Sequence, residues 1–173
     1  MDVSQETIEL LKGLDLFQEL SGSPERIEAI GATLKLKKVK AGDIIIREGE
    51  LGDCLYIIKT GSVRVLKNTL EDEMYTVIIL SANMKVFFGE LAIIDNDLRS
   101  ASVMAETDCE LLVWTRNDFE KLSANDPYLG YMVLKTISKI ISTRLRKSTK
   151  DIVTLFEALV HEVEGGADAI YNE

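Results

Sequence analysis

Apolar side chains in residues 1–36 recur at the three- and four-residue spacing of a helix. They include Ile8, Leu11 and Phe17. Ser23 followed by Pro24 is typical of the start of a second helix, because serine caps free backbone N–H groups and proline fits the first helical turn. This part of the chain is therefore predicted to be helical.

Short apolar runs separated by turns fill the next segment, residues 36–114. The runs most typical of β-strands are 44–46, 55–58, 63–66, 75–80, 101–105 and 111–114. Glycines punctuate them at positions 42, 49, 52 and 61. Many short strands without long helices between them predict a sandwich or barrel instead of a parallel sheet.

A long helix is predicted for residues 128–164, which contain no proline and a single glycine. Its apolar stripe consists of Leu129, Val133, Ile137, Ile141, Leu145, Ile152, Leu155, Leu159 and Val163. From Ile141 onward the steps alternate between four and three residues, the spacing of a coiled-coil seam, with Ser148 as a polar interruption. Such a helix would overhang a small barrel, so we expect its second half to pair with a second copy. The alternative is a helix that packs along its own barrel.

These patterns divide the chain into three parts. Residues 1–127 are expected to form the β-rich domain with its N-terminal helices, and residues 128–164 a dimerisation helix. Gly165 and Gly166 are expected to end that helix and to leave residues 165–173 as a flexible acidic tail.

Charge and hydropathy exclude several classes of protein. The chain has 173 residues and a formal net charge of -9, so it is a poor candidate for binding nucleic acid. No apolar run approaches the roughly 18 residues of a membrane span. The N-terminus begins with acidic and polar residues, unlike a signal peptide. We therefore expect a cytoplasmic protein with no membrane and no nucleic-acid partner.

Cysteine and histidine are too few for a metal site or a catalytic triad. Cys54 and Cys109 stand alone inside apolar runs and are predicted to be buried thiols. His161 is the only histidine. The sequence therefore predicts no bound metal and no enzyme activity.

Polar groups that suit a sugar phosphate are concentrated in residues 87–103. Gly89 allows close approach to the backbone, Arg99 offers several donors to phosphate oxygens, and Ser100 adds a hydroxyl. Glu90 supplies an acceptor suited to a sugar hydroxyl. The residues alone leave open an alternative, a surface ion pair between Glu90 and Arg99 that contributes little stability.

This segment resembles the phosphate-binding cassette of the cyclic nucleotide-binding domain family. The family pattern is Phe-Gly-Glu-Leu-Ala, a variable loop, and Arg-Ser-Ala, and it is matched by Phe88, Gly89, Glu90, Leu91, Ala92, Arg99, Ser100 and Ala101. The resemblance extends over roughly residues 10–150. It implies an eight-stranded double-stranded β-helix, or jelly roll, flanked by helices. It also implies that Glu90 accepts a hydrogen bond from a ribose 2′-hydroxyl, while Arg99 pairs with the cyclic phosphate with help from Ser100 and nearby backbone N–H groups.

Residues 143–150 resemble part of the long helix of bacterial catabolite-activator-type regulators. In those proteins a Thr-Ser pair reaches the adenine, one residue from each subunit of the dimer. Ser148 and Thr149 stand at the equivalent place; the alternative for Ser148 is a polar residue that sets the register of the helix pair. Those regulators continue into a DNA-binding helix-turn-helix domain, which we do not expect here because no Lys or Arg follows Lys150.

The sequence therefore predicts a cyclic nucleotide sensor that is a regulatory module and not an enzyme. Cyclic AMP is the expected ligand, with cyclic GMP left open. The signal would pass through the geometry of a homodimer or through a separate effector protein. Two alternatives are a protein–protein interaction domain that retains the cassette without a signalling ligand, and a cupin-like metalloenzyme. The single histidine disfavours the metalloenzyme.

Overall fold

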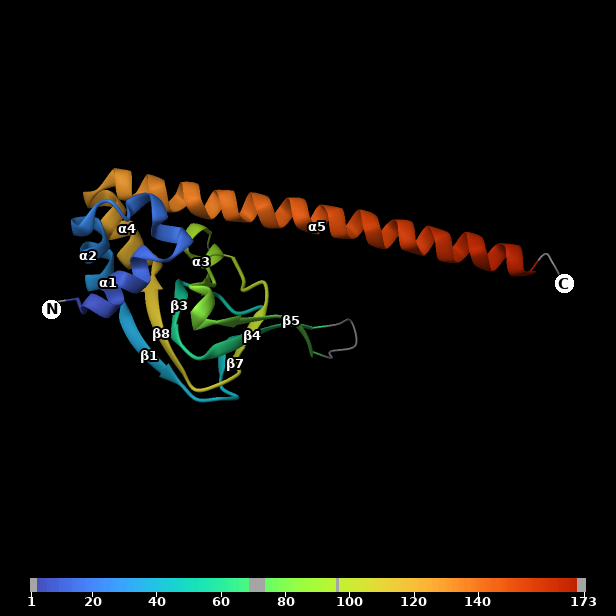
Figure 1. Ribbon diagram of the computed structural model, residues 1–173, viewed down its shortest axis with the longest axis horizontal. Helices are drawn as coiled ribbons and strands as arrows, with labels where there is room; N and C mark the ends of the chain where they lie inside the picture. The colour runs from blue at the N-terminus through green and yellow to red at the C-terminus, as the bar shows by residue number, and fades with distance from the viewer. Residues whose placement is uncertain (1–2, 69–73, 96, 171–173) are drawn as a thin grey trace. The chain divides into compact units, whose positions relative to one another are not determined.

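The computed structural model describes residues 3–68, 74–95 and 97–170, with side chains described as far as His161 (Figure 1). The chain divides into two compact units, Met1–Thr136 and Ile137–Glu173. The long helix α5, Pro127–Ile170, crosses this division. Its first turns belong to the first unit because Leu129 and Val133 are buried there. The boundary predicted from the sequence, at the start of this helix, stays a prediction.

Helices begin the first unit: α1 (Gln5–Lys12), the 3-10 helix η1 (Asp15–Leu20) and α2 (Pro24–Thr33). The side chain of Ser4 caps α1 by accepting a hydrogen bond from the Thr7 backbone N–H at 3.2 Å. Helix α2 begins at Pro24 as predicted, but the Ser23 side chain does not cap it. Its hydroxyl accepts a hydrogen bond from the Arg26 guanidinium at 3.2 Å instead.

Two four-stranded antiparallel sheets follow. The first has the order β1 (Lys35–Val39), β8 (Cys109–Thr115), β3 (Cys54–Thr60) and β6 (Phe87–Phe88). The second has the order β2 (Ile44–Ile46), β7 (Ser102–Ala105), β4 (Ser62–Asn68) and β5 (Met74–Ser81). Every neighbouring pair is antiparallel. Together with the flanking helices, these sheets confirm the predicted mainly β jelly-roll fold.

Strand β3 is buried on both faces, which explains why its residues are apolar without alternation. Alternate residues such as Ile58 pack with Val63 and Leu111 in a core of side chains from both sheets. The intervening residues, including Leu55, lie on the other face. Leu55 pairs there with Trp114, a fully buried side chain of β8.

Trp114 joins the first sheet to the helices. Its ring packs edge-on against Phe17 of η1 and against Phe119 of α4 (Arg116–Asn125), with centroids 5.6 and 5.5 Å apart. Edge-to-face pairs of this kind add to the stability from buried area. The first unit therefore consists of two sheets with a shared core and a helical layer anchored by aromatic side chains.

Helix α5 extends beyond its predicted end. Gly165 and Gly166 lie inside Pro127–Ile170, although the sequence analysis ended the helix there. Glycine lowers helix stability by about 1 kcal/mol relative to alanine, but it keeps the backbone N–H group that an α-helix needs. The rest of the predicted tail, residues 171–173, lies outside the described residues.

Asp126 connects the start of α5 to α2. Its Oδ1 accepts a hydrogen bond from the Leu129 backbone N–H at 3.1 Å, and its Oδ2 accepts one from Arg26 Nε at 2.6 Å. The hydrogen bond from Arg26 is the main cause that lowers the pKa of the Asp126 carboxyl below its usual value. The ionised carboxylate is therefore the form that stabilises this junction.

Replacing Asp126 with Asn should lower the melting temperature at neutral pH, and the deficit should shrink in acid. A carboxyl group whose pKa is lowered by folding contributes stability above its unfolded pKa of about 3.9 and loses it as the pH falls through the folded value. The difference between wild type and Asp126→Asn should therefore be constant near neutral pH and close below about pH 3.9. Thermal unfolding followed by circular dichroism would measure it. A difference independent of pH would contradict this account.

Candidate functional site

The predicted cassette forms a turn between β6 and a short helix, α3 (Leu91–Ile94). Phe88 ends β6 with its ring stacked on Tyr56, the centroids 5.2 Å apart. Gly89 then has a φ of 77°, in the left-handed region that favours glycine. This conformation turns the chain at the point where strand β6 ends and directs it into α3.

Arg99 folds back onto this turn. Its Nη1 donates a hydrogen bond to the Gly89 carbonyl at 3.1 Å, and its Nη2 donates to the Cys54 carbonyl at 2.7 Å. No carboxylate of the described residues forms an ion pair with it. The guanidinium is thus positioned by neutral backbone groups, and its positive charge is available to an anion.

Two glycines make room for the Arg99 side chain. A Cβ atom on Gly52 would overlap Arg99 Nε, and one on Gly89 would lie 2.8 Å from Arg99 Nη1. The sequence analysis identified Gly89 as a site of close approach but regarded Gly52 only as a turn residue. Gly52 is therefore a site residue that the pattern of strands and turns did not distinguish from other glycines.

Backbone pairing fixes the segment that carries Arg99. The Arg99 N–H donates to the Glu50 carbonyl at 2.8 Å, and the Gly49 N–H donates to the Arg99 carbonyl at 2.9 Å. Leu98 and Leu51 form an adjoining antiparallel bridge. The loop before β3 and the end of the cassette thus hold each other in place.

Glu90 is buried, with only 4% of its surface exposed. Among the described residues it is the buried side chain that carries a charge. A solvent-exposed ion pair with Arg99, the alternative left open by the sequence, is therefore not what the structure forms. A buried carboxylate needs hydrogen-bond donors to offset its lost hydration, which makes Glu90 a strong acceptor inside the cassette.

A cavity of about 150 Å³ lies beside the Arg99 guanidinium. It is lined by Ile45, Ile46, Arg47, Glu50, Leu51, Gly52, Asp53, Cys54, Tyr56 and Arg99. Burial is the main cause that raises the pKa of the Tyr56 hydroxyl above its usual value, so that group remains protonated. The cavity thus places the Arg99 cation next to a neutral aromatic residue and a polar loop.

The remaining residues that the sequence predicted for the site differ in burial and in the unit to which they belong. In the cassette, Ala92 is buried, Ala101 is partly buried, and Leu91 and Ser100 are exposed. Ser148 and Thr149 belong to the second unit, where both are exposed and the Thr149 hydroxyl donates to the Leu145 carbonyl at 3.0 Å. The structure thus brings the Arg99 guanidinium to the Gly89 backbone, while a role of Ser148 and Thr149 in binding stays a prediction.

Cys54 contacts Arg99 through both its side chain and its backbone carbonyl. Both cysteines are buried free thiols, as predicted. No further role for Cys54 was predicted, yet its Sγ accepts a hydrogen bond from Arg99 Nη2 at 3.6 Å, and its backbone carbonyl accepts the shortest hydrogen bond from that guanidinium, at 2.7 Å. Any residue type offers a backbone carbonyl, so the sequence contains no signal for this contact.

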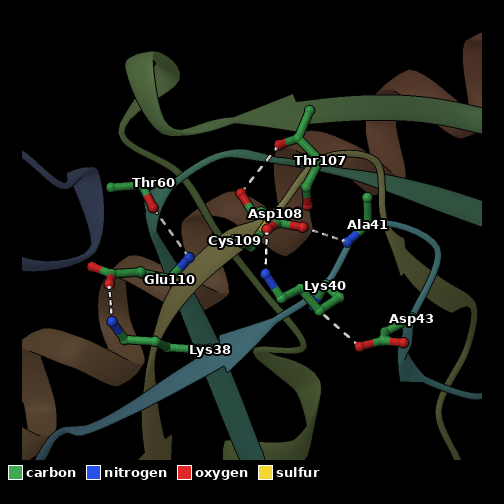
Figure 2. Close-up of polar contacts among 9 residues, drawn as sticks. All are labelled: Lys38, Lys40, Ala41, Asp43, Thr60, Thr107, Asp108, Cys109 and Glu110. Carbon is green, nitrogen blue, oxygen red and sulfur yellow. Dashed lines mark hydrogen bonds and ion pairs between the residues drawn. The ribbon is translucent and has the colours of Figure 1, made fainter.

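A larger cavity of about 540 Å³ lies at the other end of β3, around Thr60 (Figure 2). Its charged side chains are already paired: Lys40 Nζ lies 2.7 Å from Asp108 Oδ2, and Lys38 Nζ lies 2.9 Å from Glu110 Oε1. These hydrogen bonds raise the pKa of Lys40 and lower those of Asp108 and Glu110. Despite its volume, this cavity offers no charge comparable to that of Arg99.

In the part of the chain that the structure describes, no three His, Cys, Asp or Glu residues are grouped so that they could hold a metal ion. Among the described helices, none combines the length and the hydropathy of a membrane-spanning segment.

Comparison with known proteins identifies the family. A family model described as "Cyclic nucleotide-binding domain" matches residues 36–126, which include the whole cassette. The chain belongs to this family, and its matched residues form a cyclic nucleotide-binding regulatory module. The resemblance seen in the sequence is therefore confirmed.

Three curated relatives show the breadth of the family. The chain is 38% identical over 128 residues to a cyclic nucleotide-gated potassium channel of Rhizobium etli, covering 74% of this chain and 33% of the relative. It is 29% identical over 142 residues to the cyclic AMP receptor protein of Thermus thermophilus, covering 82% and 62%. It is 33% identical over 166 residues to the type II regulatory subunit of cAMP-dependent protein kinase from Drosophila melanogaster, covering 96% and 42%. The chain thus spans less than two thirds of each of these relatives.

Solved structures agree with this assignment. The catabolite activator protein of Thermus thermophilus superimposes with a TM-score of 0.72 at 28% identity, covering 82% of this chain and 62% of that one. A cyclic nucleotide-binding domain from Methylobacillus flagellatus gives the same TM-score and identity, covering 86% and 82%. Both neighbours share the β-roll and its flanking helices.

Replacing Gly52 with Ala should destabilise the cassette through Arg99. The added methyl group displaces the flexible guanidinium from the Cys54 and Gly89 carbonyls, and each hydrogen bond lost contributes about 0.5–1.5 kcal/mol. The matched control is Gly22→Ala, because a Cβ on Gly22 has no neighbour within 4 Å. Urea denaturation would compare the two free energies of unfolding. Equal free energies of unfolding for the two variants would show that the Arg99 side chain does not require a glycine at position 52.

Proposed function

We propose that this chain binds cyclic AMP and acts as a regulatory module without enzyme activity. The observation that carries the proposal is the Arg99 guanidinium, which is held by two backbone carbonyls next to the buried Glu90 and lacks a carboxylate partner among the described residues. A site with one such cation and one such acceptor fits a ribose with a cyclic phosphate. The family assignment independently supports this ligand class.

Arg99 and Glu90 divide the recognition of the ligand between them. A cyclic phosphate is a diester with one negative charge, and a guanidinium can donate two hydrogen bonds to its oxygens. Glu90 would accept a hydrogen bond from the ribose 2′-hydroxyl. Ser100 and backbone N–H groups near Gly89, Leu91 and Ala101 would complete the phosphate contacts.

Cyclic AMP is proposed over cyclic GMP on the strength of relatives. The Thermus thermophilus relative is a cyclic AMP receptor protein, and the Drosophila melanogaster relative belongs to a cAMP-dependent kinase. The regulatory domain of Toxoplasma gondii PKA, 28% identical with a TM-score of 0.62, was solved with cAMP bound. Ser148 and Thr149 are the residues proposed to reach the base, one from each subunit.

The second unit supports a homodimer. Its described part exposes a series of large apolar side chains: Leu145, Ile152, Val153, Leu155, Phe156 and Leu159. Soluble proteins rarely leave such a patch in water, and pairing with the same helix of a second copy would bury it. Val153 and Phe156 widen the apolar surface beyond the predicted seam. We propose that the dimer, or an effector protein that recognises it, carries the signal.

An interaction domain that retains the cassette without a ligand is the second candidate. This candidate is disfavoured because Gly52 and Gly89 leave room for the Arg99 side chain. Arg99 forms no ion pair with another described residue, so an ion pair within the protein does not explain its position. The cupin-like metalloenzyme finds no support in a metal-ligand cluster within those residues. Location in the cytoplasm and lack of nucleic-acid binding stay predictions.

Calorimetric titration with cyclic AMP and cyclic GMP tests the ligand. Wild type should bind cyclic AMP more tightly, and Arg99→Ala should weaken binding by roughly 2–5 kcal/mol, the cost of removing one partner of a buried charge pair. Glu90→Gln should cost less, about 0.5–1.5 kcal/mol, because it alters a hydrogen bond to a neutral hydroxyl.

Arg64→Ala is the matched control for this titration, because Arg64 is a partly buried arginine that lines neither cavity. It should bind as wild type does. The proposal is wrong if wild type binds neither nucleotide, or if Arg99→Ala binds as tightly as wild type.

Sedimentation tests the dimer. Leu155→Lys combined with Leu159→Lys should give a monomer in analytical ultracentrifugation, because two charges would enter the apolar surface. Thr154→Lys combined with Glu157→Gln changes the net charge equally at neighbouring positions off the predicted seam and should leave the dimer intact. A wild-type protein that sediments as a monomer at tens of micromolar, with and without ligand, would refute this assembly.

A further inference from the structure

Arg116, the first residue of α4, joins three backbone carbonyls from two separate segments. Its Nε donates to the Ala92 carbonyl at 2.7 Å, and its Nη2 donates to the carbonyls of Gly52, at 3.3 Å, and Asp95. Ala92 lies in α3 and Asp95 is the residue that ends it. One side chain therefore connects the end of the cassette helix to the loop before β3.

The position of Arg116 is unfavourable for α4 by itself. A cation at the start of a helix is repelled by the partial positive charge of the helix N-terminus. The carbonyls at the end of α3 carry the opposite partial charge and offset this repulsion. The Arg116 backbone N–H also donates to the Asp53 carbonyl at 2.6 Å, so the loop meets α4 through both backbone and side chain.

The segments that Arg116 joins are those that hold Arg99. Gly52 adjoins the Arg99 side chain, and Cys54, two residues later, accepts its hydrogen bond. Helix α3 begins directly after Glu90. Arg116 itself does not line the cavity beside Arg99, so we expect it to affect a ligand through the residues that it contacts.

We propose that Arg116 is a positioning residue that holds α3 and residues 52–54 in the geometry required for binding, and that links a shift of α3 to α4. This inference rests on the proposed binding of cyclic AMP. Helix α4 ends at Asn125 and α5 begins at Pro127, so a displacement of α4 acts directly on the start of the long helix. Arg116 thereby couples the cassette to the element that is proposed to carry the signal.

Titration of two Arg116 variants tests the positioning role. Arg116→Gln removes the charge and the fork of donors, whereas Arg116→Lys keeps the charge but cannot reach three carbonyls from one planar group. Both should weaken cyclic AMP binding, by about 2- to 30-fold, the range for residues that affect binding without touching the ligand. If Arg116→Gln does not fold, Arg116→Lys carries the comparison.

Arg64→Gln is the matched control. Arg64 is a partly buried arginine of β4 that donates to Glu106 at 2.7 Å, and it lines neither cavity. It should lower the melting temperature but leave the cyclic AMP affinity unchanged. Arg116 variants that lose stability while binding as tightly as wild type would refute the inference, because a merely structural residue behaves in that way.

Hydrogen exchange distinguishes the two proposed roles of Arg116, which are to hold α3 and residues 52–54 in place and to link α3 to α4. In wild type, cyclic AMP should slow amide exchange in α3 and also in α4. In Arg116→Lys at saturating ligand, slower exchange should remain in α3 and disappear from α4; unchanged protection of α4 would refute the coupling. A wild-type protein that does not bind cyclic AMP would overturn the proposed function itself, an outcome distinct from variants that bind as wild type does.

Discussion

The site depends on one arrangement, a guanidinium held by backbone carbonyls. Arg99 donates to the carbonyl of Gly89, which directly follows β6, and to that of Cys54, which begins β3. A carbonyl orients a guanidinium without neutralising it, whereas a carboxylate would do both. The cation is therefore positioned before any anion arrives, and the absence of a side chain at Gly52 and Gly89 makes this possible.

The surrounding fold supplies rigidity where this arrangement needs it. Strand β3 lies between β8 and β6, and its residues are buried against the sheet core on one face and the helical layer on the other. Because Cys54 begins this strand, the acceptor of the short hydrogen bond from Arg99 is anchored at the buried start of β3. Segments that adjoin Arg99 are then tied to α4 through Arg116.

The two cavities show why chemistry is a better guide to the site than volume. The larger one, around Thr60, is lined by lysines and carboxylates that satisfy each other. The smaller one is also lined by the carboxylates Glu50 and Asp53, but the Arg99 cation forms no ion pair with a carboxylate of the described residues. A ligand entering the larger cavity must compete with existing ion pairs, whereas an anion at Arg99 gains an interaction that the protein does not already supply.

The sequence by itself determined the class of fold and the cassette. Short apolar runs between turns predicted the strands, and the order of Gly89, Glu90 and Arg99 indicated the ligand class, because both signals are local. Tertiary structure decided what depends on neighbours distant in the chain. Ile57 and Ile58 are fully buried in β3, whereas the equally apolar Ile78 and Ile79 of β5 are half exposed, because burial depends on which other elements cover a strand. Arg99 donates to the backbone carbonyl of Cys54, and Arg116 donates to those of Ala92 and Asp95. Because backbone carbonyls have the same chemistry in every residue, the sequence does not indicate these contacts.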